Sequence, residues 1–247
     1  MALPVLNDTN TGSESANTLT HTVNLPTIVN PNELLVVWMA FDGAPTVTWD
    51  NVTHGTWTSY IDTASGTACK LVVYAKVASG MEGGGTLDVV TNDSEQSVHR
   101  SVAIGNWQGT LAGGVNCPSA TTGAGDSPNP PVATDSWGSV DRKTIAIEGC
   151  DGSQTVSAYP TDYSLNQLSD NSAGAEGVGL GSAGRDQSSA GSQNPGTFTI
   201  SASDDWVAAT FSIRGADLSS VPNPPRFRDL DYFKLSGEST RTFTNVE

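Results

Sequence analysis

Hydrophobic and polar residues alternate along most of this chain in short runs, from about residue 18 to residue 214. Leu19, His21, Val23 and Leu25 alternate with polar residues, which is typical of a half-buried strand. Residues 34–41 are continuously apolar and predict a central strand that is covered on both faces. Gly, Ser, Thr, Asn, Asp and Pro separate the runs, so the pattern predicts strands joined by turns.

Further strands are expected throughout this region. A long Gly- and Pro-rich loop is expected at 109–131, and 166–196 offers one short strand near Val178. No useful window shows the 3.6-residue apolar period of a helix. The other predicted strands lie at 46–49, 56–61, 70–77, 87–89, 97–107, 145–147, 156–159, 198–200 and 206–213.

About twelve strands with this turn chemistry favour antiparallel pairing, and two packed sheets can bury their apolar faces. We therefore predict an all-β protein, an antiparallel β-sandwich of jelly-roll or related type with a C-terminal extended arm. The predicted organisation is a polar lead-in at 1–17, a sandwich at 18–215, a Pro-rich hinge at 216–225 and a docking arm at 226–247.

The predicted arm follows Pro222, Pro224 and Pro225, which disfavour helix and should end the domain. Its apolar surface is larger than a solvated tail needs. It could fold back onto its own sandwich, or dock on a neighbouring subunit by strand addition or in aromatic pockets. The predicted docking residues are Phe227, Leu230, Tyr232, Phe233, Leu235 and Phe243.

Charge narrows the range of partners. The 247 residues carry a formal net charge of −15, whereas 226–247 holds four basic and four acidic residues, so the body carries the whole excess. Such a body repels nucleic acid and anionic membranes and attracts basic protein surfaces or cations, although solubility alone could explain the charge.

No apolar stretch is long enough for a transmembrane helix. Cys69 and Cys150 are expected to be buried free thiols, and with Cys117 the chain has an odd number of cysteines, three.

Catalytic patterns are weak, and we predict that the chain is not an enzyme. Gly125-Asp126-Ser127 resembles the start of one hydrolase family but lies in a Pro-rich loop, with no His in a matching position. Glu148 and Asp151 are the nearest approach to a glycosidase carboxylate pair, in a stretch that reads as a turn. No P-loop occurs. His21 falls on the apolar side of its strand and is expected in the core.

The sequence offers candidate residues for two kinds of binding site, one for a glycan and one for a metal ion. Aromatic rings near strand ends could bind a glycan or could plug the ends of the sandwich. Aspartates at strand ends and in loops could bind Ca²⁺, but no DxDxDG loop occurs, so we predict no metal and no cofactor. The possible glycan-binding residues are Trp49, Trp57, Trp107 and Trp137. The aspartates are Asp42, Asp50, Asp93, Asp126, Asp135, Asp204 and Asp205.

The Met-Ala-Leu-Pro start and the small-residue-rich body resemble virion proteins of tailed bacteriophages. The tracts SWGSVDRKTIAIEGCDGSQTVSAYPTDYS and NPGTFTISASDDWVAATFSIRG resemble segments of phage-borne β proteins, and the resemblance covers about 18–215. It implies a head decoration (cement), fibre or tail component located in the virion after synthesis in the host cytoplasm.

On this basis we expect a non-enzymatic structural protein. The leading hypothesis is a capsid decoration or cement protein that bridges neighbouring subunits. Its partners would be the major capsid protein or other virion subunits, with a homo-oligomer, by analogy a trimer, as the assembly. The alternative is a carbohydrate-binding adhesin on a tail or fibre. A glycan-active enzyme is the third hypothesis.

Overall fold

The computed structural model describes residues 1–174 and 176–217. Within them the strands form two six-stranded antiparallel sheets and one two-stranded sheet, so the predicted all-β antiparallel sandwich is confirmed. The predicted hinge from residue 218 onward and the whole predicted arm, with Phe227, Leu230, Tyr232, Phe233, Leu235 and Phe243, lie outside the described residues.

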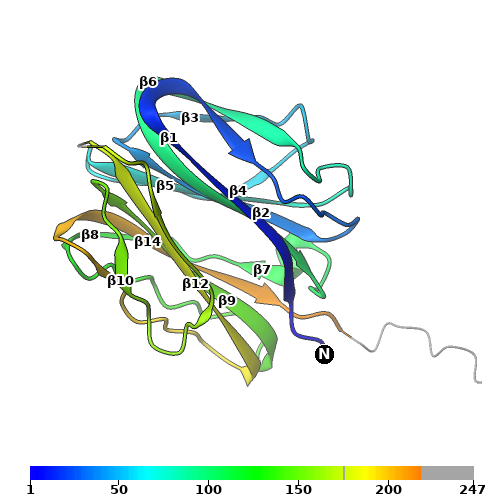
Figure 1. The fold of residues 1–247 in the computed structure, drawn as a ribbon. Helices are drawn as coiled ribbons and strands as arrows, with labels where there is room; N and C mark the ends of the chain where they lie inside the picture. Colours follow the sequence, from blue (N-terminus) through cyan, green and yellow to red (C-terminus); the bar gives the residue numbers. More distant parts are fainter. Residues whose placement is uncertain (175, 218–247) are drawn as a thin grey trace, which may run out of the picture. The chain divides into compact units, whose positions relative to one another are not determined.

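The first sheet has the order β1-β6-β2-β5-β4, with β3 paired to β6, and every pairing is antiparallel. All of its strands come from the N-terminal part of the chain, and it forms the upper layer in Figure 1. Its strands are β1 (Val5–Asn24), β2 (Leu34–Asp42), β3 (Val47–Trp49), β4 (Thr58–Ser65), β5 (Cys69–Val77) and β6 (Thr86–Gly105).

The second sheet has the order β11-β12-β9-β14-β7, with β8 paired to β14. A small sheet of β10 and β13 accompanies it, and one short helix, α1 (Leu111–Gly114), precedes β7. The remaining strands are β7 (Val115–Asn116), β8 (Thr121–Gly125), β9 (Val140–Asp151), β10 (Val156–Ala158), β11 (Leu165–Asn171), β12 (Val178–Ala190), β13 (Thr199–Ile200) and β14 (Asp204–Arg214).

The main core lies between the two sheets. From β2 it takes Leu34, Val36 and Trp38, and from β14 it takes Val207 and Phe211, all at most 1% exposed. The alternate residues of β2 point to the other face, where they are buried as well, which explains why 34–41 is apolar without interruption. The prediction of a central strand covered on both faces is thus confirmed.

The outer face of the first sheet is covered by its own longest strands. β1 and β6 pair along most of their lengths, with register shifts near Glu14 and Thr18, and the two strands turn over together as a ribbon (Figure 1). The end of β1 folds back toward its first half, where the side-chain amide of Asn24 donates from Nδ2 to the Thr11 carbonyl oxygen at 3.4 Å. We call residues 18–25 and 86–91 the folded ribbon.

A second core lies under the folded ribbon. Val23 and Leu25 from β1 and the following turn meet Val37 and Met39 from the outer face of β2, all completely buried. Two aromatic rings close the same cluster, since Trp49 stacks on Tyr74 with 4.1 Å between ring centroids. The ribbon therefore gives the first sheet a hydrophobic layer on each face.

The outer face of the second sheet is also covered. Phe198 and Tyr163 pack there against Ala146 of β9 and Ala183 of β12. Ile200 of β13 joins Cys150 and Trp206 in a neighbouring cluster. Cys69 and Cys150 are buried free thiols, as predicted, and Cys117 is a partly buried free thiol.

Four segments differ from the sequence prediction. Residues 7–17, predicted as a lead-in before the domain, belong to β1; their polar character suits an edge strand with solvent on one side. The strands predicted at 87–89 and 97–107 are one strand, β6. The predicted loop at 109–131 contains α1, β7 and β8, and β11 is an unpredicted edge strand with mostly exposed side chains.

Candidate functional site

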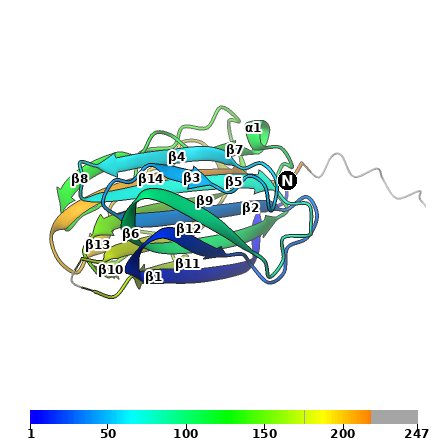
Figure 2. The same cartoon turned by 90° about the horizontal axis from the view of Figure 1, so that it is seen from above.

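Carboxylates from both sheets gather at one end of the sandwich. This end lies where β8 finishes and β14 begins, opposite the end with α1 and the N-terminus (Figure 2). β2 and β9 finish there, and the middle of β6 passes it, since Phe41 pairs with Ser97. We call this set the acidic end. It consists of Asp42, Asp93, Glu95, Asp151, Glu176, Asp204 and Asp205.

Three carboxyls of the acidic end, those of Asp42, Glu95 and Asp151, have a raised pKa. Burial raises the pKa of Asp42 to about 6, and repulsion from Asp151 and Glu176 adds to the rise. Burial, followed by repulsion from Asp42 and Asp93, raises the pKa of Glu95 to about 7. Both side chains are half-buried; burial is the larger cause of each rise, and repulsion between like charges adds to it.

The pKa of Asp151 is also raised, first by burial and then by the nearby charges of Asp204 and Asp205. Among the described residues, none of the seven carboxylates of the acidic end forms an ion pair. Carboxylates elsewhere do, including Asp62 with Lys70 at 2.5 Å and Glu82 with Lys76 at 2.7 Å. The acidic end is thus a concentrated negative surface without internal compensation.

Two glycines bring the carboxylates close to the backbone. Gly43 follows β2 with a φ of +78°, and a Cβ there would lie 2.6 Å from Glu95 Oε1. Gly152 follows β9 with a φ of +69°, and a Cβ there would lie 2.8 Å from Asp204 Oδ2. At both positions a side chain would be strained and would displace a carboxylate, so glycine favours this charge arrangement.

The predicted aspartates fall into different surroundings. Asp42, Asp93, Asp204 and Asp205 share the acidic end. Asp50 accepts hydrogen bonds from the amides of Val52 and Thr53 in a turn. Asp126 accepts one from Ser127 Oγ at 2.8 Å, and Asp135 pairs with Arg142. In the described part of the chain no group of three or more His, Cys, Asp or Glu side chains is arranged to bind a metal ion.

The four tryptophans predicted as possible glycan-binding residues do not form one surface. Trp49, Trp57 and Trp107 are 6%, 5% and 5% exposed. Trp49 and Trp57 pack under the folded ribbon, and Trp107 donates from Nε1 to the Asn32 carbonyl at 2.8 Å. Trp137 is partly exposed beside the Arg142 guanidinium. A glycan needs an exposed ring face, which the first three do not offer.

The residues weighed for catalysis are also separated. Glu148 and Asp151 lie three residues apart on β9, so they point to opposite faces; Glu148 is completely buried and Asp151 belongs to the acidic end. His21 of the folded ribbon and His99 of β6 are both buried, and His54 forms a hydrogen bond with the Thr86 carbonyl at 3.0 Å. The expectation of a core position for His21 agrees with its 0% exposure.

Sequence reasoning placed Asp42, Asp204 and Asp205 at strand ends, but it did not identify Glu95, Asp151 or Glu176 as their neighbours. The strand order determines which ends meet, and no local pattern reports it. Among the described residues, no helix has the length and the apolar character to span a bilayer. Comparison of the chain with known proteins finds no matching family model, curated protein or solved structure.

Proposed function

We propose that this chain is a non-enzymatic structural protein of a phage particle, a decoration or cement protein that bridges neighbouring subunits. The assignment to a particle rests on the sequence resemblance described above. The observation that supports binding to a neighbour is the acidic end, whose uncompensated carboxylates are suited to a basic protein surface.

Association at the acidic end would relieve an electrostatic cost. Asp42 and Glu95 carry raised pKa values partly because the neighbouring carboxylates repel them. A Lys or Arg side chain of a partner would stabilise the ionised forms and return these pKa values toward ordinary ones. Such a contact favours fast and specific docking more than high affinity by itself.

The sandwich is suited to hold this charge in a fixed place. Carboxylates come from both sheets, and the sheets are joined by a continuous buried core. Little side-chain or backbone freedom therefore has to be lost when the acidic end meets a partner, which favours binding. The arm at 226–247, which lies outside the described residues, is proposed as a second contact with a neighbouring subunit.

Charge reversal can test the acidic end. The Asp205→Lys variant should bind at least tenfold more weakly to purified particles that lack this chain, measured by co-sedimentation. Asp88→Lys is the matched control, because Asp88 is exposed on β6 in the folded ribbon and its replacement changes the net charge equally. Binding of the native chain should also weaken as salt is raised.

Equal loss for both variants would indicate that only net charge matters, and unchanged binding of Asp205→Lys would reject the acidic end as the contact. Failure of the native chain to bind any particle component would reject the proposed function itself.

A further inference from the structure

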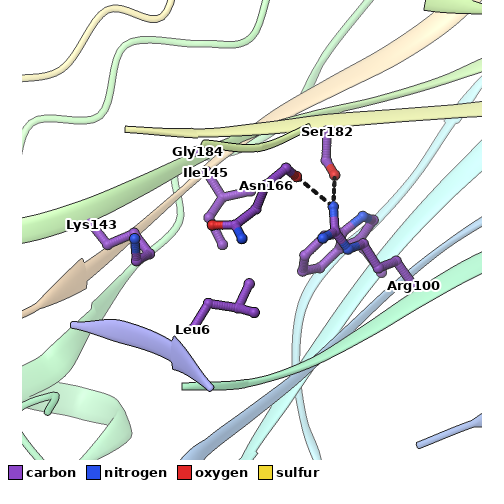
Figure 3. A pocket seen from close by; sticks show the side chains of 8 residues that line it. Leu6, Arg100, Lys143, Ile145, Asn166, Ser182 and Gly184 are labelled. Atoms are coloured by element: carbon purple, nitrogen blue, oxygen red, sulfur yellow. Dashed lines mark hydrogen bonds between the residues drawn. The ribbon is translucent and has the colours of Figure 1, made fainter. Parts of the chain in front are cut away.

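A buried guanidinium lies between the two sheets, at the open edge where β1 faces β11. Arg100 projects from the inner face of β6 and is 5% exposed. Its Nη1 donates to the Asn166 carbonyl at 2.6 Å and to Ser182 Oγ at 3.1 Å (Figure 3). Its Nε donates to Thr9 Oγ1 at 3.1 Å, and Trp38 lies beside it with 5.7 Å from ring centroid to Cζ.

All of these acceptors are neutral. Within the described residues Arg100 forms no ion pair, whereas the other deeply buried guanidinium, that of Arg142, pairs with Asp135. Burial lowers the pKa of Arg100 to about 10, so the side chain stays charged at neutral pH at a cost in solvation. A buried cation of this kind is stabilised by an anion more than by a dipole.

A second cation borders the same space. Lys143 of β9 is 4% exposed, lines the cavity with Arg100, and pairs with Asp186 Oδ1 at 2.5 Å. Asp186 can compensate one of the two positive charges, so the group keeps an excess charge of +1. In Figure 3 the Lys143 and Arg100 side chains lie on opposite sides of the cavity, with Asn166 and Leu6 between them.

The cavity is small. Its volume is about 10 Å³ for the centre of a water-sized sphere, which corresponds to about one water molecule. Phosphate, sulfate and carboxylates with a carbon chain are too large for such a space. Trp38 and Ile145 supply apolar wall, and Ser182 and Asn166 supply polar groups. A monatomic halide is the kind of anion closest to this size, and chloride, which is less strongly hydrated than fluoride, loses less hydration free energy on entering a partly apolar cavity.

We propose that this cavity is a halide-binding site, in which one chloride ion lies between the Arg100 guanidinium and the Lys143 ammonium group. The Nη2 group of Arg100, which has no hydrogen-bond partner among the described residues, supplies a donor for the ion. The ion completes the charge balance of Arg100, Lys143 and Asp186 and joins the first sheet to the second. This site is separate from the acidic end and does not depend on the proposed function.

Diffraction from crystals grown in sodium bromide tests the site directly, because bromide scatters anomalously and water does not. The expected result is an anomalous peak within hydrogen-bond distance of an Arg100 Nη atom, on the Lys143 side. A cavity that contains water alone, with bromide only at exposed lysines or arginines, would overturn the proposal.

A solution test uses the native chain and a cavity-filling variant. Replacing Arg100 would also remove its bonds to β11 and β12, so the cavity is filled from Leu6, which lines it. The thermal midpoint of the native chain should rise with chloride when chloride replaces gluconate at constant ionic strength, because a ligand that binds only the folded state stabilises it. Leu6→Phe should lose this rise.

Leu19→Phe is the matched control, since Leu19 is 49% exposed on the same strand. It should keep the chloride response of the native chain. An equal chloride response in the native chain and in Leu6→Phe would contradict the site, because the effect would then arise elsewhere. No chloride response in the native chain would contradict it as well.

Discussion

The backbone amide of Asn24 donates a hydrogen bond to Nε2 of His99, at 3.0 Å. This bond joins the returning end of β1 to the outer face of β6, and it requires an unprotonated Nε2. Ser101 Oγ donates to the Asn24 carbonyl at 2.6 Å beside it. His21 lies in the same layer, with its two ring nitrogens 2.9 Å from Ser97 Oγ and 3.2 Å from Thr91 Oγ1. Neutral histidines thus hold the folded ribbon on its sheet.

The first prediction is that acid destabilises the folded ribbon. Burial lowers the pKa of both His21 and His99 to about 4, from 6.5. The folded state then binds fewer protons than the unfolded state between these values, so stability is present above pH 6.5 and is lost as the pH falls toward 4. Each histidine contributes about 3 kcal/mol to this loss.

Urea denaturation between pH 7 and pH 4 measures the effect. His99→Gln retains an acceptor for the Asn24 amide without titrating, so the native chain should lose about 3 kcal/mol of stability relative to this variant between pH 7 and pH 4. A pH dependence identical to that of the native chain would show that His99 does not contribute.

The second prediction concerns Glu148, whose titration changes the stability with pH in the opposite direction to that of the histidines. Its carboxyl is buried on the outer face of the second sheet, and Oε2 has no hydrogen-bond partner. Gly181 lies opposite it on β12, where a Cβ would come within 2.4 Å of Oε1. Burial raises the pKa of Glu148 to about 7, from 4.5.

For a carboxyl with a raised folded-state pKa, the favourable contribution is complete below pH 4.5 and is lost as the pH rises through 7. Glu148→Gln should therefore be more stable than the native chain at pH 8, by about 3 kcal/mol, and nearly equal to it at pH 4.5. Calorimetry at both pH values checks this difference. The exposed Asp88→Asn serves as control, and a similar gain there would point to net charge as the cause.

The third prediction is that the pair of Arg142 and Asp135 holds the loop before β9. Both side chains are 0% exposed, and Asn116 Nδ2 adds a bond to Asp135 Oδ1 at 2.5 Å. Asp135→Ala leaves a buried guanidinium without its carboxylate and should lower the free energy of unfolding by about 3–5 kcal/mol. The double variant Asp135→Leu with Arg142→Met should recover much of this loss in chemical denaturation. A double variant as unstable as Asp135→Ala would show that the pair stabilises the fold by more than the avoidance of an unpaired buried charge.

The fourth prediction concerns the arm. A chain that ends at Val221 keeps every residue of the described cores, so its thermal midpoint should stay within a few degrees of the native value. The same chain should fail to enter particles if residues 222–247 dock on a neighbour. Normal incorporation of the shortened chain would remove the arm from the proposed function, and the acidic end would remain to be tested separately.

The sequence predicts best those strands whose burial is symmetrical or regular. β2 is apolar on both faces and β14 alternates clearly, so both were predicted close to their bounds. Residues 7–17 and β11 were not, because edge strands with exposed polar side chains resemble loops in composition. The turning over of β1 and β6 depends on packing against β2, which no window of either strand reports.

The charged interior had a local signal that the sequence prediction did not use. Arg100 lies between Val98 and Val102 on the inward positions of β6, and Lys143 shares the inward positions of β9 with Ile145. A basic residue at an inward position of an apolar alternation indicates a buried cation. Its partners could not be predicted, since Ser182, Asn166 and Thr9 come from three other strands.

The division of the chain between the sheets affects synthesis on the ribosome. All strands of the first sheet end by Gly105, whereas β9 and β14 lie at residues 140–151 and 204–214. Synthesis proceeds at roughly 5–20 residues per second. The inner face of the first sheet, which includes Leu34, Val36 and Trp38, therefore stays uncovered on the order of ten seconds until the second sheet has been synthesised. During that interval the emerging polypeptide is exposed to self-association, and a chaperone that shields this side would raise the yield of folded protein.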